Sequence, residues 1–154
     1  MGYFEIGIYQ PIHTENIGTL WRTAYQMGAS GIFVIGKPPR RQTSDTARTN
    51  LNIPLRVFPG WSAFQQNRPQ GARIVGIEMG GEKLATFKHP EQAIYVLGSE
   101  ANGLPSSVRS SCDHIVSIES IRSVSFNVAV SGAIVLYHRW LQSGFPPELL
   151  EANE

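Results

Sequence analysis

The sequence contains a single cysteine, Cys112, among its 154 residues. One cysteine cannot form an internal disulfide or a multi-cysteine zinc site, and no neighbouring motif would activate it as a nucleophile. We therefore expect a small buried or half-buried thiol. Long hydrophobic runs are also missing, because the stretch from Val128 to Leu136 is interrupted by Ser131 and Gly132. That stretch is too short to span a bilayer.

Two common phosphate-binding motifs are absent. No G-x-G-x-x-G follows the first predicted strand, and the sequence has no G-x-x-x-x-G-K-[ST] loop. These absences disfavour a dehydrogenase and a small-molecule kinase. The sequence enters a predicted strand at once, without the basic and apolar regions of an export signal, so we expect a cytoplasmic protein. Its 42% hydrophobic and 16% charged residues are typical of an ordinary globular domain.

Acidic residues are scarce in one third of the chain. Residues 22–73 contain one acid, Asp45, against eight basic residues, so this segment carries +7 while the whole chain carries +1. Arginine supplies ten of the thirteen basic residues, which favours forked contacts to phosphate. Any single arginine is explained as well by a solvated surface. The cluster as a whole favours a polyanionic partner.

Hydrophobic periodicity predicts alternating strands and helices. The predicted strands are Tyr3–Tyr9, Gly31–Ile35, Ile53–Phe58, Arg73–Glu78, Ala93–Leu97 and His114–Ile118. The predicted helices are Asn16–Met27, Ser62–Asn67, Pro105–Cys112 and Phe126–Gln142. Gly28 suits a helix C-terminus, Gly80-Gly81 a turn, and residues 37–52 a long basic loop. This alternation predicts an α/β fold with a mostly parallel sheet covered by helices on both faces. We expect one domain over residues 1–145 and a frayed acidic tail over 146–154.

Three polar segments interrupt this pattern. The first follows the buried strand Ala93–Leu97, where Gly98 and Gly103 permit close approach of the backbone to a ligand and Glu100 lies between them. The second places Asn16, Gly18 and Arg22 within two turns of a helix start. Asn16 is equally well explained as an N-cap, and Arg22 lies on the same helix face as Gly18, within reach of a phosphate held there.

The third segment, Ser123 to Asn127, joins the last predicted strand to the last helix. Ser125 is the natural N-cap of that helix. Asn127 then points a neutral amide towards the strand ends, and the two side chains together offer a donor and an acceptor to a hydroxyl group.

Together, these segments resemble the three motifs of the SpoU (TrmH-like) branch of the SPOUT superfamily. Members of this branch are S-adenosylmethionine-dependent RNA 2′-O-ribose methyltransferases. The family motifs are Asn-x-Gly-x-x-x-Arg, a strand ending in Leu-Gly-x-Glu-x-x-Gly-Leu, and Ile-Pro-Met followed by Ser-Leu-Asn-Val. The matching residues are, in motif order, Asn16, Gly18 and Arg22; Leu97, Gly98, Glu100, Gly103 and Leu104; and Ile118 with Ser125, Phe126, Asn127 and Val128. The resemblance covers nearly the whole chain.

The third motif departs from the family pattern. Glu119-Ser120 stands where Pro-Met is usual, the spacer is about one residue short, and the usual glycine is missing, with Arg122 nearby. In the family, backbone groups of this loop hold the cofactor. The departure therefore bears on the path that the loop backbone takes around the cofactor. The serine and asparagine of the motif are both present.

The resemblance implies a SPOUT fold with a C-terminal trefoil knot and a homodimer with its RNA site near the interface. It also implies methylation of RNA, with tRNA favoured over ribosomal RNA, and S-adenosylmethionine as the cofactor, converted to S-adenosylhomocysteine without a metal. The implied catalytic residues are Arg22, Ser125, Asn127 and Glu100. The implied cofactor-binding residues are Leu97, Gly98, Gly103, Ile118 and Val124. The implied RNA-binding residues are Asn16, Lys37, Arg40, Arg41 and Arg48.

The role of Glu100 stays open between organising the loop and contacting the substrate. Two other functions also stay open. A base-methylating SPOUT enzyme would share the fold but would not need the Ser-x-Asn arrangement. A non-catalytic RNA-binding module would bind RNA without binding the cofactor.

Overall fold

A single six-stranded sheet organises the chain. The structure, a computed structural model, describes residues 2–39 and 52–144. The strand order is β3-β2-β1-β5-β4-β6, and every neighbouring pair is parallel. The strands are β1 (Phe4–Tyr9), β2 (Gly31–Ile35), β3 (Leu55–Phe58), β4 (Arg73–Lys83), β5 (Ala93–Leu97) and β6 (His114–Ser117). The α/β fold with a mostly parallel sheet is therefore confirmed.

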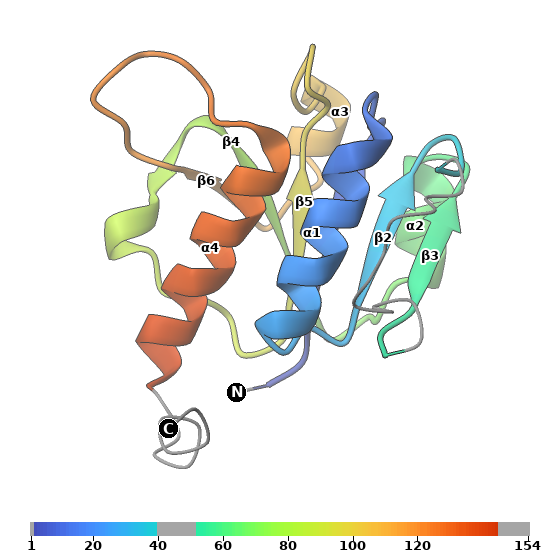
Figure 1. Cartoon of the computed structure of the whole chain (residues 1–154), viewed down its shortest axis with the longest axis horizontal. Helices are drawn as coiled ribbons and strands as arrows, with labels where there is room; N and C mark the ends of the chain where they lie inside the picture. The colour runs from blue at the N-terminus through green and yellow to red at the C-terminus, as the bar shows by residue number, and fades with distance from the viewer. Residues whose placement is uncertain (1, 40–51, 145–154) are drawn as a thin grey trace.

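Helices cover both faces of the sheet, as predicted (Figure 1). The helices α1 (Thr14–Gln26) and α4 (Val128–Ser143) pack on one face, in a core with side chains such as Ile6, Leu20 and Val135. The short helices α2 (Trp61–Asn67) and α3 (Ser106–Arg109) pack on the other, where Phe64 and Val108 meet the opposite face of the strands. Because both faces are covered, β2 and β5 are buried at every residue, which explains their continuous apolar runs.

The Gly80-Gly81 pair lies within a strand, so the predicted turn is wrong. β4 continues to Lys83, and its pairing with β6 shifts register between Ile77 and Glu82. A Cβ on Gly81 would lie 2.4 Å from the Ile115 carbonyl oxygen, and Gly80 has a φ of +83°. The glycines therefore form a bulge that keeps β4 against β6 while residues 78–81 leave the ladder. A short 3₁₀ helix, η2 (Leu84–Thr86), follows.

Two predicted helix caps are also wrong. The N-cap of α1 is His13, so Asn16 lies inside the first turn. The N-cap of α4 is Asn127, whose Oδ1 accepts a hydrogen bond from the Val130 N–H at 3.2 Å, and Ser125 precedes it. Of these two helices, only α4 has a side-chain cap, because the His13 side chain makes no capping hydrogen bond at the start of α1. α3 also ends at Arg109, three residues before the predicted end.

A buried arginine fixes the far end of α4. Arg139, 4% exposed, donates to the carbonyl oxygens of Pro90 at 2.6 Å and Glu91 at 2.8 Å and to the Tyr95 hydroxyl at 3.1 Å. These bonds join α4 to the segment that leads into β5. They therefore set the position of the helix, whose N-terminus lies at the carboxyl ends of the strands.

Some predictions fall outside the described residues. Arg40, Arg41 and Arg48 lie there, as does the expected tail over 146–154, so the domain boundary at 145 stays a prediction. Within the described residues, no helix is both long and apolar enough to cross a membrane.

Candidate methyl-donor and RNA site

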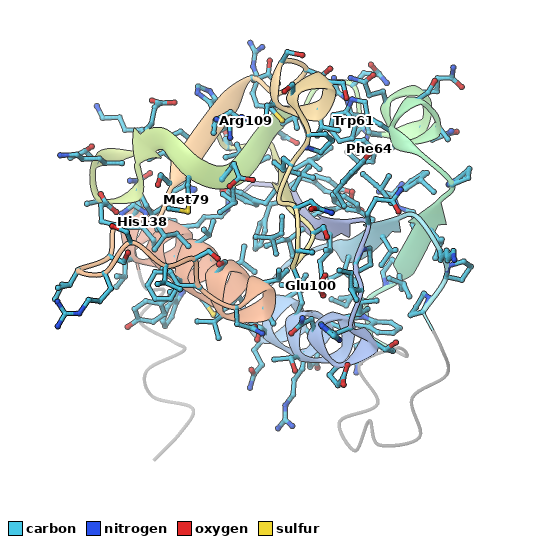
Figure 2. All side chains as sticks on the ribbon, turned by 90° about the horizontal axis from the view of Figure 1, so that it is seen from above. Trp61, Phe64, Met79, Glu100, Arg109 and His138 are labelled. Atoms are coloured by element: carbon cyan, nitrogen blue, oxygen red, sulfur yellow. The ribbon has the colours of Figure 1, made fainter. Side chains whose placement is uncertain are left out.

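One cavity of about 750 Å³ lies at the bulge of β4 and the carboxyl ends of β5 and β6. Its walls are the bulge of β4 (77–80), the turn after β5 (97–103) and the loop from β6 into α4 (117–128). The start of α1 adds His13 and Asn16, and α4 adds Ser131. Figure 2 looks down on this end of the sheet and shows Glu100 beside the start of α1. Loops at the carboxyl ends of parallel strands are where α/β proteins bind ligands.

The turn after β5 is closed on itself. Ser99 and Gly103 exchange two backbone hydrogen bonds, at 3.2 and 3.0 Å. A Cβ on Gly98 would lie 2.5 Å from the carbonyl carbon of Gly103, and Gly103 has a φ of +62°. The two glycines therefore allow a tight turn that presents its backbone to the cavity.

The three predicted motifs meet through a hydrogen-bond network. Glu100 accepts hydrogen bonds from the N–H groups of Ile12 at 2.8 Å and His13 at 3.1 Å and from Asn16 Nδ2 at 2.9 Å. Asn127 Nδ2 donates to Asn16 Oδ1 at 3.0 Å. The carboxylate thus holds the start of α1, and Asn16, 8% exposed, connects it to the start of α4. Of the two roles left open for Glu100, these contacts support organisation of the loop.

The network lowers the pKa of Glu100. Partial burial by itself raises the pKa of this carboxyl, but the hydrogen bonds from Asn16, Ile12 and His13 outweigh it and bring the pKa below its ordinary value of 4.5. The ionised form is therefore favoured in the folded protein.

This shift predicts a pH-dependent contribution to stability. Because the folded pKa is lower than the unfolded pKa, the stabilisation is complete above the unfolded value and is lost as the pH falls through the folded value. We expect Glu100→Gln to reduce the free energy of unfolding at pH 7, and the difference from the unsubstituted protein to shrink below about pH 4.5. Urea unfolding between pH 3 and 7 measures it. A difference independent of pH would contradict this account of the carboxylate.

The cavity brings together most of the predicted site residues. Its lining includes, from the prediction, Asn16, Leu97, Gly98, Glu100, Gly103, Ile118, Val124, Ser125 and Asn127. Arg22 and Lys37 are not part of the lining. Arg22 lies on the exposed face of α1, and Lys37 is exposed beyond β2. The motif that contains Arg22 could not reveal its separation from the cavity, because this depends on the rotation of α1 about its own axis.

The unusual segment Glu119-Ser120 has defined contacts. Glu119 Oε1 accepts a hydrogen bond from the Ala85 N–H in η2 at 3.1 Å, and the Ser120 hydroxyl donates to the Arg122 carbonyl at 2.6 Å. Beyond it the loop is open to solvent, with Ile121 95% and Val124 72% exposed. Glu119 therefore ties the loop to η2, and Ser120 makes a bond within the loop.

The lining residues that sequence reasoning missed include Glu78, His13 and Ser131. Glu78 ends the predicted strand Arg73–Glu78, so its place at the carboxyl edge was the signal available. It accepts hydrogen bonds from the N–H groups of Met79 and Leu104, both at 2.8 Å. His13 and Ser131 carry no comparable signal, because their approach to the cavity depends on how α1 and α4 pack.

Several basic residues of the arginine-rich segment are used within the fold. Arg56 pairs with Glu5, which is 3% exposed, and Arg73 lies 3.5 Å from the Asp113 carboxylate. Arg68 donates to the carbonyl oxygens of Pro69 and Ala72. The positive charge available to a partner is therefore smaller than the sequence count of this segment suggested.

Cys112 is half-buried, as expected. Burial, followed by the neighbouring Asp113 charge, raises the pKa of its thiol to about 11. The thiol is therefore protonated at neutral pH, which agrees with a structural role.

Comparison with known proteins places the chain among RNA-modifying enzymes. The model of the SpoU rRNA Methylase family matches residues 3–137. An uncharacterized tRNA/rRNA methyltransferase of Mycobacterium tuberculosis is 31% identical, over 91% of this chain and 46% of that protein. The chain thus spans less than half the length of this curated relative.

Two solved structures share the fold. One, described as giving insights into the 2-OH methylation of C/U34 on tRNA, is 27% identical, with a TM-score of 0.77 over 92% of this chain and 97% of that one. The other is the SpoU methyltransferase AviRb from Streptomyces viridochromogenes in complex with AdoMet. It is 23% identical, with a TM-score of 0.74 over 89% of this chain and 56% of that one. At that identity the likeness concerns the fold.

Proposed function

Because this chain belongs to the SpoU rRNA methylase family, we propose that it transfers a methyl group from S-adenosylmethionine to a ribose 2′-hydroxyl of RNA. We propose tRNA as the substrate, since the neighbour described for tRNA methylation is matched over 97% of its length. Ribosomal RNA is the second candidate, because the family model is named for rRNA and the curated relative for both tRNA and rRNA.

The observation that carries this proposal is the Asn16–Glu100–Asn127 network. It joins residues from three segments of the chain at one cavity, with Ser125 on the same wall. An arrangement needed only for the fold would not require a serine and an asparagine facing a cavity of about 750 Å³. A cavity of this size is suited to a small-molecule cofactor.

The residues of the cavity fit S-adenosylmethionine. Leu97, Ile118 and Val124 offer apolar surface. The turn between Gly98 and Gly103 offers backbone groups, and a side chain on either glycine would clash with the turn or with Glu78. These are the residues that would hold the cofactor, which supplies a methyl group already activated on a sulfonium sulfur. No metal is needed for such a donor.

Asn127 and Ser125 are suited to orient the ribose hydroxyl. An asparagine amide has two donor hydrogens and an oxygen with two lone pairs. Asn127 uses one donor on Asn16 and one lone pair on the Val130 N–H, so one of each remains for a ligand. Because Asn16 and Glu100 fix this amide, the hydroxyl can be held in line before its proton is removed.

We propose that Arg22 binds the RNA phosphate and assists deprotonation from outside the cavity wall. It is exposed on α1 and does not line the cavity of its own chain. We propose that Arg22 contacts the reacting hydroxyl once RNA, or a second copy of the chain, has bound beside the cavity. Lys37, with Arg40, Arg41 and Arg48, would hold the RNA backbone in a salt-dependent manner and with little sequence information. We also propose a cytoplasmic location, which is compatible with this substrate.

We further propose a homodimer and a C-terminal trefoil knot. In support of the dimer, α4 and the loop before it expose an apolar stripe at helical spacing: Phe126, Val130, Tyr137 and Leu141, between 38% and 49% exposed. The knot is proposed from the family membership of the chain.

The stripe gives a prediction about assembly. We expect Tyr137→Glu with Leu141→Glu to convert the protein from dimer to monomer, because two carboxylates would be desolvated in the interface. Sedimentation equilibrium measures the change. Val57→Glu, at a 39% exposed position on the edge strand β3, is the matched control and should leave the mass unchanged. A dimer that survives the double substitution would place the interface elsewhere.

The reaction is tested with methyl-labelled S-adenosylmethionine and bulk tRNA. We expect label in the RNA and, after alkaline hydrolysis, in a dinucleotide, because a 2′-O-methyl group protects the adjacent phosphodiester. Label only in mononucleotides would indicate base methylation. RNA binding with neither label transfer nor cofactor binding would indicate a non-catalytic module.

A further inference from the structure

The cavity has an acidic lining, although the proposed substrate is a polyanion. Three carboxylates line it, those of Glu78, Glu100 and Glu119, against the single guanidinium of Arg122. Carboxylates repel RNA phosphate, so RNA binding does not account for them. The positively charged methyl donor is the partner of the proposed reaction that such a lining suits.

Glu78 is the carboxylate placed within the walls of the cavity. It is half-buried, and its two oxygens join two walls: Oε1 accepts from the Met79 N–H in the bulge of β4, and Oε2 accepts from the Leu104 N–H after the turn. The Gly103 backbone lies against it, since a Cβ there would be 2.2 Å from Glu78 Oε2. Two of its roughly four acceptor positions remain for other partners.

The other two carboxylates are less available. Glu100 accepts three hydrogen bonds from the start of α1, where the positive end of the helix dipole offsets its charge. Glu119 is exposed and accepts from the Ala85 N–H in η2. Water screens an exposed charge, so its effect on a ligand in the cavity is weaker.

We propose that Glu78 is a specificity-determining residue that favours the positively charged methyl donor over its neutral product. This inference rests on the proposed function. S-adenosylmethionine and S-adenosylhomocysteine share their adenosine, amino and carboxylate groups and differ in the methyl group and the charge on sulfur. A fixed anion in the wall stabilises the sulfonium form and loses that attraction once the methyl group has left, which favours release of the product.

The test is calorimetric titration of Glu78→Gln with three ligands: S-adenosylmethionine, S-adenosylhomocysteine and sinefungin, in which an amine carries the positive charge. Glutamine keeps the shape of the side chain but loses the charge and one of the two acceptor oxygens. Any damage to the walls weakens all three ligands together. We expect the affinity ratio of S-adenosylmethionine to S-adenosylhomocysteine to fall about tenfold. The affinity for sinefungin should fall by the same factor as that for S-adenosylmethionine.

Glu119→Gln is the matched control, because it removes a carboxylate from the same lining. In this variant we expect the affinity ratio of S-adenosylmethionine to S-adenosylhomocysteine to change by less than about twofold, since the Glu119 carboxylate is exposed. The proposal is overturned if Glu78→Gln weakens donor and product equally, or if Glu119→Gln shifts the ratio as much. Absence of donor binding to the unsubstituted protein would contradict the proposed function itself, whereas an unchanged ratio contradicts only the role of Glu78.

Discussion

Asn127→Ala is expected to slow methyl transfer by ~10²–10³-fold, the cost typical of removing one oriented polar group at a reacting centre. The substitution removes the amide that contacts Asn16 and that we assign to the ribose hydroxyl. It also removes the N-cap of α4, which costs about 1 kcal/mol of stability. That cost is too small to explain the loss of rate by unfolding. Single-turnover transfer of labelled methyl to RNA measures the effect.

Asn67→Ala is the matched control for Asn127→Ala. The Asn67 amide donates to the Ala63 carbonyl in α2, away from the cavity lining. We expect it to leave the rate unchanged. Full activity in Asn127→Ala would contradict the assigned role and favour a base-methylating enzyme of the same fold, which does not need this amide.

Gly103→Val is expected to weaken binding of S-adenosylmethionine by about 100-fold or more. The residue has a φ of +62°, and a Cβ would lie 2.2 Å from Glu78 Oε2. A left-handed conformation costs a non-glycine residue about 1–2 kcal/mol, and overpacking costs about 1–3 kcal/mol. Either the turn or the Glu78 carboxylate must therefore move, and both belong to the wall of the cavity. Calorimetry measures the affinity, and circular dichroism confirms that the variant is folded.

Two further variants separate the effect on the site from unfolding. Gly103→Ala is milder and should weaken the affinity by an intermediate factor with the sheet intact. Gly71→Ala is the control, because its Cβ would meet nothing within 4 Å. Normal cofactor affinity in a folded Gly103→Val would show that the turn is not a wall of the cofactor site.

The strands were predictable because burial on both faces leaves a local sequence signal. β2 and β5 begin and end at the predicted residues, since each is a continuous apolar run. The Gly80-Gly81 pair was misread because a glycine pair can mark either a turn or a bulge. The choice depends on Ile115, more than thirty residues away, whose backbone passes directly against Gly81.

The sequence predicted which residues belong to the site but not which of them hydrogen-bond to one another. Three motifs identified Asn16, Glu100 and Asn127, but the hydrogen bonds that join them span 84 and 111 residues. Local rules assigned Asn16 and Ser125 to helix caps, whereas the fold uses His13 and Asn127. The motif that contains Arg22 gives no information on which way that side chain points once α1 has packed on the sheet.

We assign the binding of the methyl donor to the turn after β5, the bulge of β4 and the loop before α4. A crystal structure of the protein with S-adenosylhomocysteine tests it most directly. We predict the nucleoside in the cavity lined by Leu97, Gly103 and Ile118, with its sulfur on the side of Asn127. A ligand bound at another surface, with this cavity holding only water, would show that these three segments do not form the cofactor site.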